Sequence, residues 1–163
     1  MVESLIATLK DREWKVRGVA IFVLGQLGDT RAIPELERVT KEDSNQHVRN
    51  TAKANLNHLM ARDFVNSETR LAEAESLAKE AVELQPDNAA FHDTLGWAFY
   101  KQGKYTEAIA ALEKAIALQR HFAPAHYHLG LAYLKTSKRE KGMRELETAF
   151  TLDERYREAA KRE

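Results

Sequence analysis

Residues 89–122, AAFHDTLGWAFYKQGKYTEAIAALEKAIALQRHF, decide the fold because most of their pattern recurs directly after them. A shift of 34 residues superimposes identical or similar side chains: Leu95 on Leu129, Gly96 on Gly130, Ala98 on Ala132, Phe99 on Tyr133, Lys101 on Lys135, Leu112 on Leu146, Ala115 on Ala149 and Leu118 on Leu152. Self-similarity at a fixed period of this length is typical of solenoids.

Apolar residues recur at three- and four-residue intervals along the whole chain, which predicts helices throughout. In this region we expect helices at 89–101, 104–118, 123–135 and 138–152, followed by a polar capping helix at 153–163. Gly96 and Gly130 fall within predicted helices, where glycine costs about 1 kcal/mol relative to alanine. Their recurrence indicates that a partner helix approaches closely at these two positions.

The first sixty residues carry a different repeat, with a period of 32, that places Asp11 on Asp43 and Val16-Arg17 on Val48-Arg49. Each copy predicts a short helix, at 2–10 and 31–41, then an aspartate in a turn and a longer helix, at 13–27 and 45–62. The aspartate can accept hydrogen bonds from free amides where the longer helix begins. Gly28 is expected to end a helix, Asp29 or Thr30 to begin the next, and Pro34 to fall in or near its first turn.

Arg17 and Arg49 have two interpretations. They can form a basic ladder for a ligand, or they can join neighbouring repeats by pairing with the aspartates. Recurrence at the same place in each copy favours the structural role. Between the two repeat regions, residues 63–67 predict a junction before a helix at 68–84, and helix 45–62 is expected to serve both regions. A flexible linker is the alternative, but the junction contains no glycine or proline.

Composition excludes several classes of function. Lysine plus arginine and aspartate plus glutamate both number 25, so the formal net charge is zero, which argues against binding nucleic acid through its phosphates. The chain contains no cysteine, which excludes disulfides and thiolate chemistry. No apolar run approaches the roughly 20 residues of a membrane-spanning helix, and no signal segment follows Met1. We therefore expect a cytoplasmic protein without membrane insertion.

The period-34 pattern resembles the tetratricopeptide repeat, with the signature carried by Leu95, Gly96, Phe99, Gly103, Tyr105, Ala108 and Ala115. The period-32 pattern resembles HEAT-like repeats of the phycobilisome-lyase type. These resemblances imply an all-α fold, a right-handed superhelix of antiparallel helix pairs. They divide the chain into two HEAT-like pairs at 1–62 and a tetratricopeptide array at 63–163, with a partial unit at 63–88 and units at 89–122 and 123–152. The third unit departs from the family at Ser137, Arg139 and Gly142.

The tetratricopeptide family binds peptides in a concave groove, which the resemblance maps to one stripe of each unit's first helix. The predicted partner-binding residues are Asp93, Trp97, Tyr100 and Lys101, with Tyr127, Leu131, Leu134 and Lys135 at the equivalent positions. Aromatic side chains in such a groove bury a large area at low entropic cost, and lysines can bind a peptide carboxylate. The alternative is that Trp97 and Tyr127 only pack between neighbouring helices.

Other kinds of site have little support in the sequence. The carboxylate clamp that recognises chaperone C-termini needs asparagine and basic residues where this chain has Asp93, Trp97 and Leu131. The histidines show no metal-ligand spacing, His126 and His128 diverge on a helix, and no nucleophile and base can be paired. We therefore expect no cofactor, no metal and no enzyme activity.

The sequence thus predicts a scaffold that binds a protein or peptide segment in the tetratricopeptide groove. Two alternatives remain open. The HEAT-like half can indicate an accessory protein in chromophore attachment, although the chain lacks an acid–base cluster. The apolar helix near Met1 has no polar cap, so the chain can also be a stacking module that associates with itself or with a larger assembly.

Overall fold

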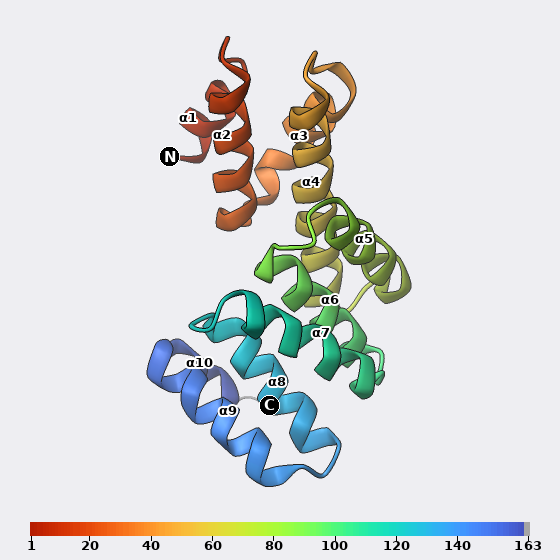
Figure 1. Ribbon diagram of the computed structural model, residues 1–163, viewed down its shortest axis with the longest axis vertical. Coiled ribbons are helices and arrows are strands. Elements are labelled where there is room, and N and C mark those ends of the chain that lie inside the picture. The colour runs from red at the N-terminus through yellow and green to blue at the C-terminus, as the bar shows by residue number, and fades with distance from the viewer. Residues whose placement is uncertain (162–163) are drawn as a thin grey trace. The chain divides into compact units, whose positions relative to one another are not determined.

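The computed structural model describes residues 1–161, and every regular element in that part of the chain is a helix (Figure 1). The expected all-α fold is therefore confirmed, with neighbouring helices stacked as pairs. By its internal contacts the chain divides into two compact units, Met1–Pro86 and Asp87–Glu163, which are described separately. Within the described residues, no helix has the length and apolarity needed to cross a membrane.

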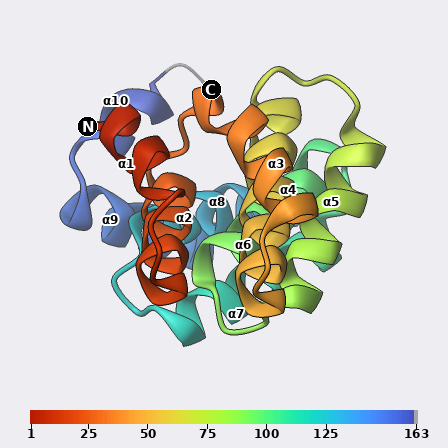
Figure 2. The same cartoon turned by 90° about the horizontal axis from the view of Figure 1, so that it is seen from above.

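The first unit contains five α-helices and one short 3₁₀ helix. They are α1 (Val2–Thr8), α2 (Trp14–Leu27), η1 (Thr30–Ala32), α3 (Ile33–Glu42), α4 (Gln46–Asn66) and α5 (Leu71–Leu84). Helix α1 packs on α2, α3 packs on α4, and α2 also packs on α4 (Figures 1 and 2). The core between them is closed by fully buried apolar side chains, among them Ile21, Leu24, Leu36 and Val48.

The turn between α2 and α3 follows the sequence prediction. Gly28 ends α2 in the left-handed conformation, with φ of 67°, and its carbonyl accepts a hydrogen bond of 3.0 Å from Arg62 Nη2. Asp29 begins η1 by accepting a hydrogen bond from the Arg31 amide, and Pro34 lies in the first turn of α3. A side chain at residue 28 would be strained and would also meet the Arg62 guanidinium.

Helix α4 is longer than predicted. The expected junction at 63–67 is wrong, because the helix continues to Asn66 and the chain turns over residues 67–70. The burial of Ala61 and Val65, one turn apart, explains this continuation, since both side chains gain from staying on the packed face. Glu68 and Arg70 then take left-handed backbone conformations, and α5 begins at Leu71 instead of residue 68.

Helix α4 was expected to serve both repeat regions, and it does contact helices before and after it in the chain. That α5 belongs to the tetratricopeptide array stays a prediction. Helix α4 packs against α2 and α3 with one part of its surface and against α5 with another. The contact with α5 includes a hydrogen bond of 2.8 Å from Asn57 Nδ2 to Glu80 Oε2 and an ion pair between Lys53 and Glu80. Together these partners bury eleven of the helix's residues.

The second unit contains α6 (Ala89–Lys101), α7 (Tyr105–Leu118), α8 (Ala123–Lys135), α9 (Arg139–Leu152) and α10 (Arg155–Ala160). Asn88 caps α6 by accepting a hydrogen bond of 3.0 Å from the Ala90 amide. Helices α6 and α7 form one pair, α8 and α9 form the next, and α7 packs on α8 (Figure 1). Helix α10 occupies part of the predicted capping segment, whose last two positions, 162 and 163, lie outside the described residues.

The close approach expected at the helical glycines is confirmed. A Cβ atom on Gly96 would lie 2.5 Å from Leu112 Cγ of α7, and one on Gly130 would lie 2.7 Å from Leu146 Cγ of α9. Both distances are shorter than van der Waals contact, so each pair of helices depends on the missing side chain. In the loops, Ser137 adopts the left-handed conformation of the equivalent Gly103, with φ of 60°, so the third unit keeps its turn despite the substitution.

Candidate functional site

Helix α6 carries two stripes of side chains with different environments. Leu95 and Phe99 are buried, and Gly96 between them lies against Leu112 of the paired helix α7. The second stripe holds Asp93, Trp97, Tyr100 and Lys101, which the sequence predicted to bind a partner. In the structure, aromatic residues of α8 and α10 join this stripe through ring contacts.

Trp97 lies at the centre of this group. Its ring stacks on Tyr100, with centroids 4.7 Å apart, and on His128 of α8, with centroids 4.2 Å apart. The amine of Lys101 lies 4.8 Å from the centroid of the same indole ring, within the range of a cation–π interaction. Trp97 and Lys101 remain half-buried, whereas Tyr100 is 9% exposed. Trp97 is therefore held in place by its neighbours while part of the residue remains accessible to solvent.

His128 was not among the predicted site residues. Its Nδ1 atom lies 2.7 Å from Asp93 Oδ1, so the histidine links the start of the α6 stripe to α8 while its ring stacks on Trp97. The 34-residue shift pairs Asp93 with Tyr127, because it compares equivalent positions of successive repeats. Such a comparison does not reveal which side chains of neighbouring helices touch, and this is why the sequence pattern missed His128.

Tyr127 and the C-terminal helix extend the group. The ring of Tyr127, which is 5% exposed, lies 4.9 Å from that of Tyr156 on α10 and 5.8 Å from that of His128. Burial raises the pKa of Tyr156 to about 12, and the negative charges of Asp93 and Asp153 add to this effect. We call the five rings the aromatic cluster: Trp97, Tyr100, Tyr127, His128 and Tyr156.

The other three predicted residues lie elsewhere on α8. Leu131 is buried. Leu134 is 37% exposed and directs its side chain toward α9, where its Cδ2 atom would lie 2.9 Å from a Cβ atom on Gly142. Lys135 is exposed at the end of the helix. The structure therefore does not group Leu134 with Trp97, although the repeat aligns Leu134 with Tyr100.

His126 has separate contacts from His128, as expected for residues two apart on a helix. Its Nδ1 atom lies 2.6 Å from Glu145 Oε2, and its Nε2 atom lies 2.9 Å from the Arg120 carbonyl oxygen. The side chain is buried and joins α8 to α9 and to the preceding turn. Among residues 1–161, no group of three or more histidine, aspartate or glutamate side chains has the geometry of a metal site.

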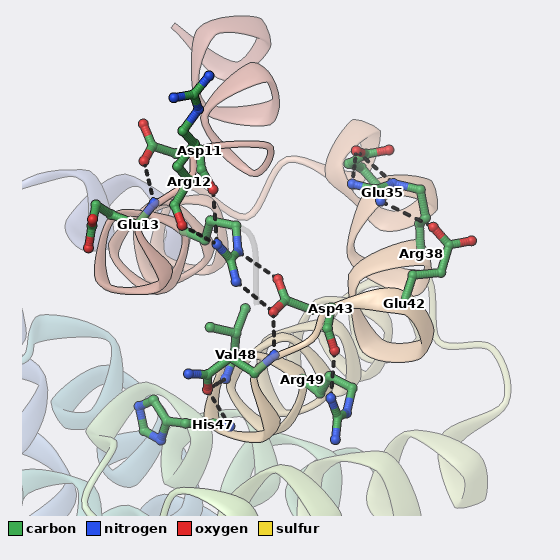
Figure 3. A network of polar contacts seen from close by, with 12 residues as sticks. Asp11, Arg12, Glu13, Glu35, Arg38, Glu42, Asp43, His47, Val48 and Arg49 are labelled. Atoms are coloured by element: carbon green, nitrogen blue, oxygen red, sulfur yellow. Dashed lines mark hydrogen bonds and ion pairs between the residues drawn. The ribbon is translucent and has the colours of Figure 1, made fainter.

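The repeated aspartates and arginines of the first unit form a second polar network (Figure 3). Arg17 of α2 binds Asp43 with two hydrogen bonds, from Nε to Oδ2 at 2.6 Å and from Nη2 to Oδ1 at 2.7 Å. Arg17 Nη1 also donates to the carbonyl oxygen of Asp11, and Arg49 Nη1 donates to that of Asp43. The hydrogen bonds from Arg17 hold the pKa of Asp43 below its usual range.

These contacts support the structural interpretation of the arginines. The side chains of Arg17 and Asp43 are 11% and 6% exposed, so little of either faces a ligand. Asp11 and Asp43 each accept a hydrogen bond from the backbone amide two residues later, those of Glu13 and Asn45. The predicted hydrogen bond to the turn aspartate is thus present. Its donor is the amide of the residue directly before each longer helix. Asn45 itself caps α4.

Comparison with protein families agrees with both repeat patterns. A HEAT repeat model matches residues 2–66, a TPR repeat model matches residues 96–137, and a tetratricopeptide repeat model matches residues 123–156. No curated protein matches the chain.

Several solved structures share the fold at low sequence identity. The first TPR domain of Spaghetti (RPAP3) bound to HSP90 peptide SRMEEVD is 20% identical, with a TM-score of 0.58 over 62% of this chain and 79% of that chain. The Arabidopsis OM64 TPR domain is 17% identical, with a TM-score of 0.62 over 69% and 95%. MamA from Desulfovibrio magneticus RS-1 is 19% identical, with a TM-score of 0.58 over 87% and 76%. The chain is therefore a helical-repeat protein in which HEAT repeats, within residues 2–66, precede tetratricopeptide repeats, within residues 96–156.

Proposed function

We propose that the chain is a non-enzymatic scaffold that binds a peptide segment of a partner protein through the aromatic cluster. The observation that carries this proposal is the position of Trp97, which is held by stacking on Tyr100 and His128 yet keeps part of its ring accessible. A rigid aromatic side chain that loses little entropy on binding is the typical anchor of a protein interface.

The members of the cluster contribute in different ways. Tyr100 and Tyr127 are buried, so they support the surface instead of supplying most of it. A ligand contacts the half-buried residues Trp97, Lys101, His128 and Tyr156. The amine of Lys101 attracts a carboxylate beside the apolar indole surface, and the exposed Lys135 is a second positive charge on α8. This pattern fits a segment with one apolar anchor and an acidic group.

The comparisons support binding of this general kind. The first TPR domain of RPAP3 was solved with an HSP90 peptide, and its fold resembles this chain at 20% identity. A likeness at that identity concerns the fold, so the peptide chosen by this chain depends on its own side chains. The matching families are repeat families, and the absence of cysteine is compatible with a reducing compartment such as the cytoplasm. Affinity in the micromolar range, about −8 kcal/mol, is expected for one such segment.

Affinity capture from the source lysate tests this function. The baits are the wild-type chain, the Trp97→Ala/Tyr127→Ala double variant and a Trp14→Ala control that removes the exposed tryptophan of the first unit. Circular dichroism establishes that each bait is folded, and a single Trp97→Ala variant covers the case in which loss of the buried Tyr127 ring unfolds the double variant. We expect a protein that wild type and the control retain and that Trp97→Ala loses. Retention of the same proteins by all folded baits would refute the proposal.

A further inference from the structure

The two HEAT pairs can be compared position by position because they repeat with a period of 32. Asn55 of α4 lies against α2, since a Cβ atom on Gly25 would be 1.9 Å from Asn55 Oδ1. Val48 and Thr51 lie on the same face as Asn55 by helical spacing. All three are buried, with exposed fractions of 0%, 8% and 1%. This face of α4 is therefore the one that the preceding helix α2 covers.

On the equivalent face of α2, no helix within residues 1–161 provides such a cover. Its residues are Val16, Val19 and Val23, at the positions of Val48, Thr51 and Asn55. Val16 is 39% exposed, Val19 is 63% exposed, and Val23 is half-buried. A row of two exposed valines and one half-buried valine on a helix surface is typical of an interaction site. Beside it, an apolar depression of about 280 Å³ lies between α1 and α2.

The polar part of the HEAT repeat shows the same difference. Asp43 accepts two hydrogen bonds from Arg17, the arginine of the preceding pair. Asp11 holds the equivalent position in the first pair and makes the same backbone contact, with the amide of Glu13 at 2.8 Å. Asp11 is exposed, so its carboxylate remains accessible to a cation. Asp11 and the three valines of the first pair thus correspond to Asp43, Val48, Thr51 and Asn55 of the second pair. In the second pair, Arg17 binds the aspartate and α2 covers the other three residues.

We propose that this surface of α2, formed by Asp11, Val16, Val19 and Val23, docks a HEAT-type helix pair of another protein. The second helix of that pair would pack on the valines as α2 packs on α4, and an arginine at the position of Arg17 would bind Asp11. A second copy of this chain is a poor fit for the role. Its own α2 is already covered by α4 on the corresponding side, and its α4 is covered by α5.

The proposal predicts that a HEAT pair placed in register will fit, and the chain itself supplies the probe. A copy of residues 1–32 is joined in front of residues 1–163, so that Arg17 of the copy can reach Asp11 of the original repeat. We expect a higher urea midpoint for the extended chain than for the parent. Asp11→Asn in the original repeat keeps an acceptor for the Glu13 amide but removes a charge near Arg17 of the same repeat. It should therefore lower the midpoint of the extended chain by more than it lowers that of the parent.

Two further measurements test the surface independently. Val19→Glu in the original repeat should remove the gain in midpoint from the added copy, and Arg17→Gln in the copy should reduce it. An extended chain with no higher midpoint, or an Asp11→Asn effect of equal size in both chains, would overturn the proposal. Sedimentation of the parent should show a monomer. A dimer that Val19→Glu dissociates would assign the surface to a second copy and would also overturn it, without bearing on the function proposed for the aromatic cluster.

Discussion

Arg17 and Asp43 form a two-point ion pair that joins the first HEAT pair to the second, with both side chains almost completely removed from solvent. The planar guanidinium matches the carboxylate, and its third nitrogen donates to the carbonyl oxygens of Asp11 and Arg12. The Arg17 side chain therefore holds the turn that precedes its own helix and the turn that precedes α4. This geometry explains why an arginine recurs at that place in the repeat.

Replacing Arg17 by alanine should lower the free energy of unfolding by about 2 to 4 kcal/mol, because Asp43 would be left buried without its partner. Urea denaturation measures the change. The control is Arg38→Ala, which removes pairs with Glu35 and Glu42 within α3, where Arg38 is more exposed than Arg17. That change should cost less than about 1 kcal/mol. Equal costs for the two variants would contradict the structural role of Arg17.

The helical glycines give a prediction with opposite signs at two sites. Gly96→Ala should destabilise the protein by about 1 to 3 kcal/mol, because the new methyl group would meet Leu112 Cγ at 2.5 Å. Gly18 also lies within a helix, but a Cβ atom there meets nothing within 4 Å. Gly18→Ala should therefore stabilise by about 0.4 to 1 kcal/mol through the unfolded state. Thermal unfolding of each variant, compared with wild type, measures the two changes. A stability change of the same sign in both variants would contradict the prediction.

His58 should make stability depend on pH below neutrality. Its burial in α4, together with the nearby charge of Arg62, lowers its pKa to about 3. In the unfolded chain its pKa is about 6.5, so between these values the unfolded state binds a proton that the folded state does not. The free energy of unfolding should be insensitive to this residue above pH 6.5. Below it, stability should fall by up to about 1.4 kcal/mol per pH unit.

Urea denaturation at pH 7, 6 and 5 measures this slope for His58. His58→Gln removes the titrating group and should flatten the slope, even if the variant is less stable at every pH. His121→Gln changes an exposed histidine and should leave the slope as in wild type. A His58→Gln variant with the full wild-type slope would show that other groups cause the pH dependence.

The sequence predicted most of the fold because local signals and repetition agree. Gly28 marks the end of α2 and Pro34 the first turn of α3 by backbone chemistry that depends on few neighbours. The predicted end of α4 was too early, because the helix continues so that Ala61 and Val65 stay buried against neighbouring helices. This tertiary burial has no local sequence signal. For the site, helical periodicity placed Trp97 and Tyr100 on one stripe, and the resemblance to the tetratricopeptide family implied that this stripe binds a partner. Periodicity could not identify His128, since contact between neighbouring repeats depends on how the helices pack.

The peptide SRMEEVD, seen with the first TPR domain of RPAP3, offers a direct test of ligand choice. We expect it not to bind this chain. Clamp recognition needs asparagine and basic side chains, whereas here Leu131 is buried and apolar. SRMEEVD carries three acidic side chains instead of the single acidic group that Lys101 attracts, and the Asp93 carboxylate repels the additional charges. The chain has two tryptophans, so Trp14→Phe leaves Trp97 as the only reporter. The Trp97 ring stacks on His128 and lies near the Lys101 amine. Its fluorescence should stay constant as the peptide is added up to about millimolar concentration, which would reveal a dissociation constant in the millimolar range. A saturable change that Asp93→Asn strengthens would instead mean that the lysines suffice for a clamp and that Asp93 only weakens it.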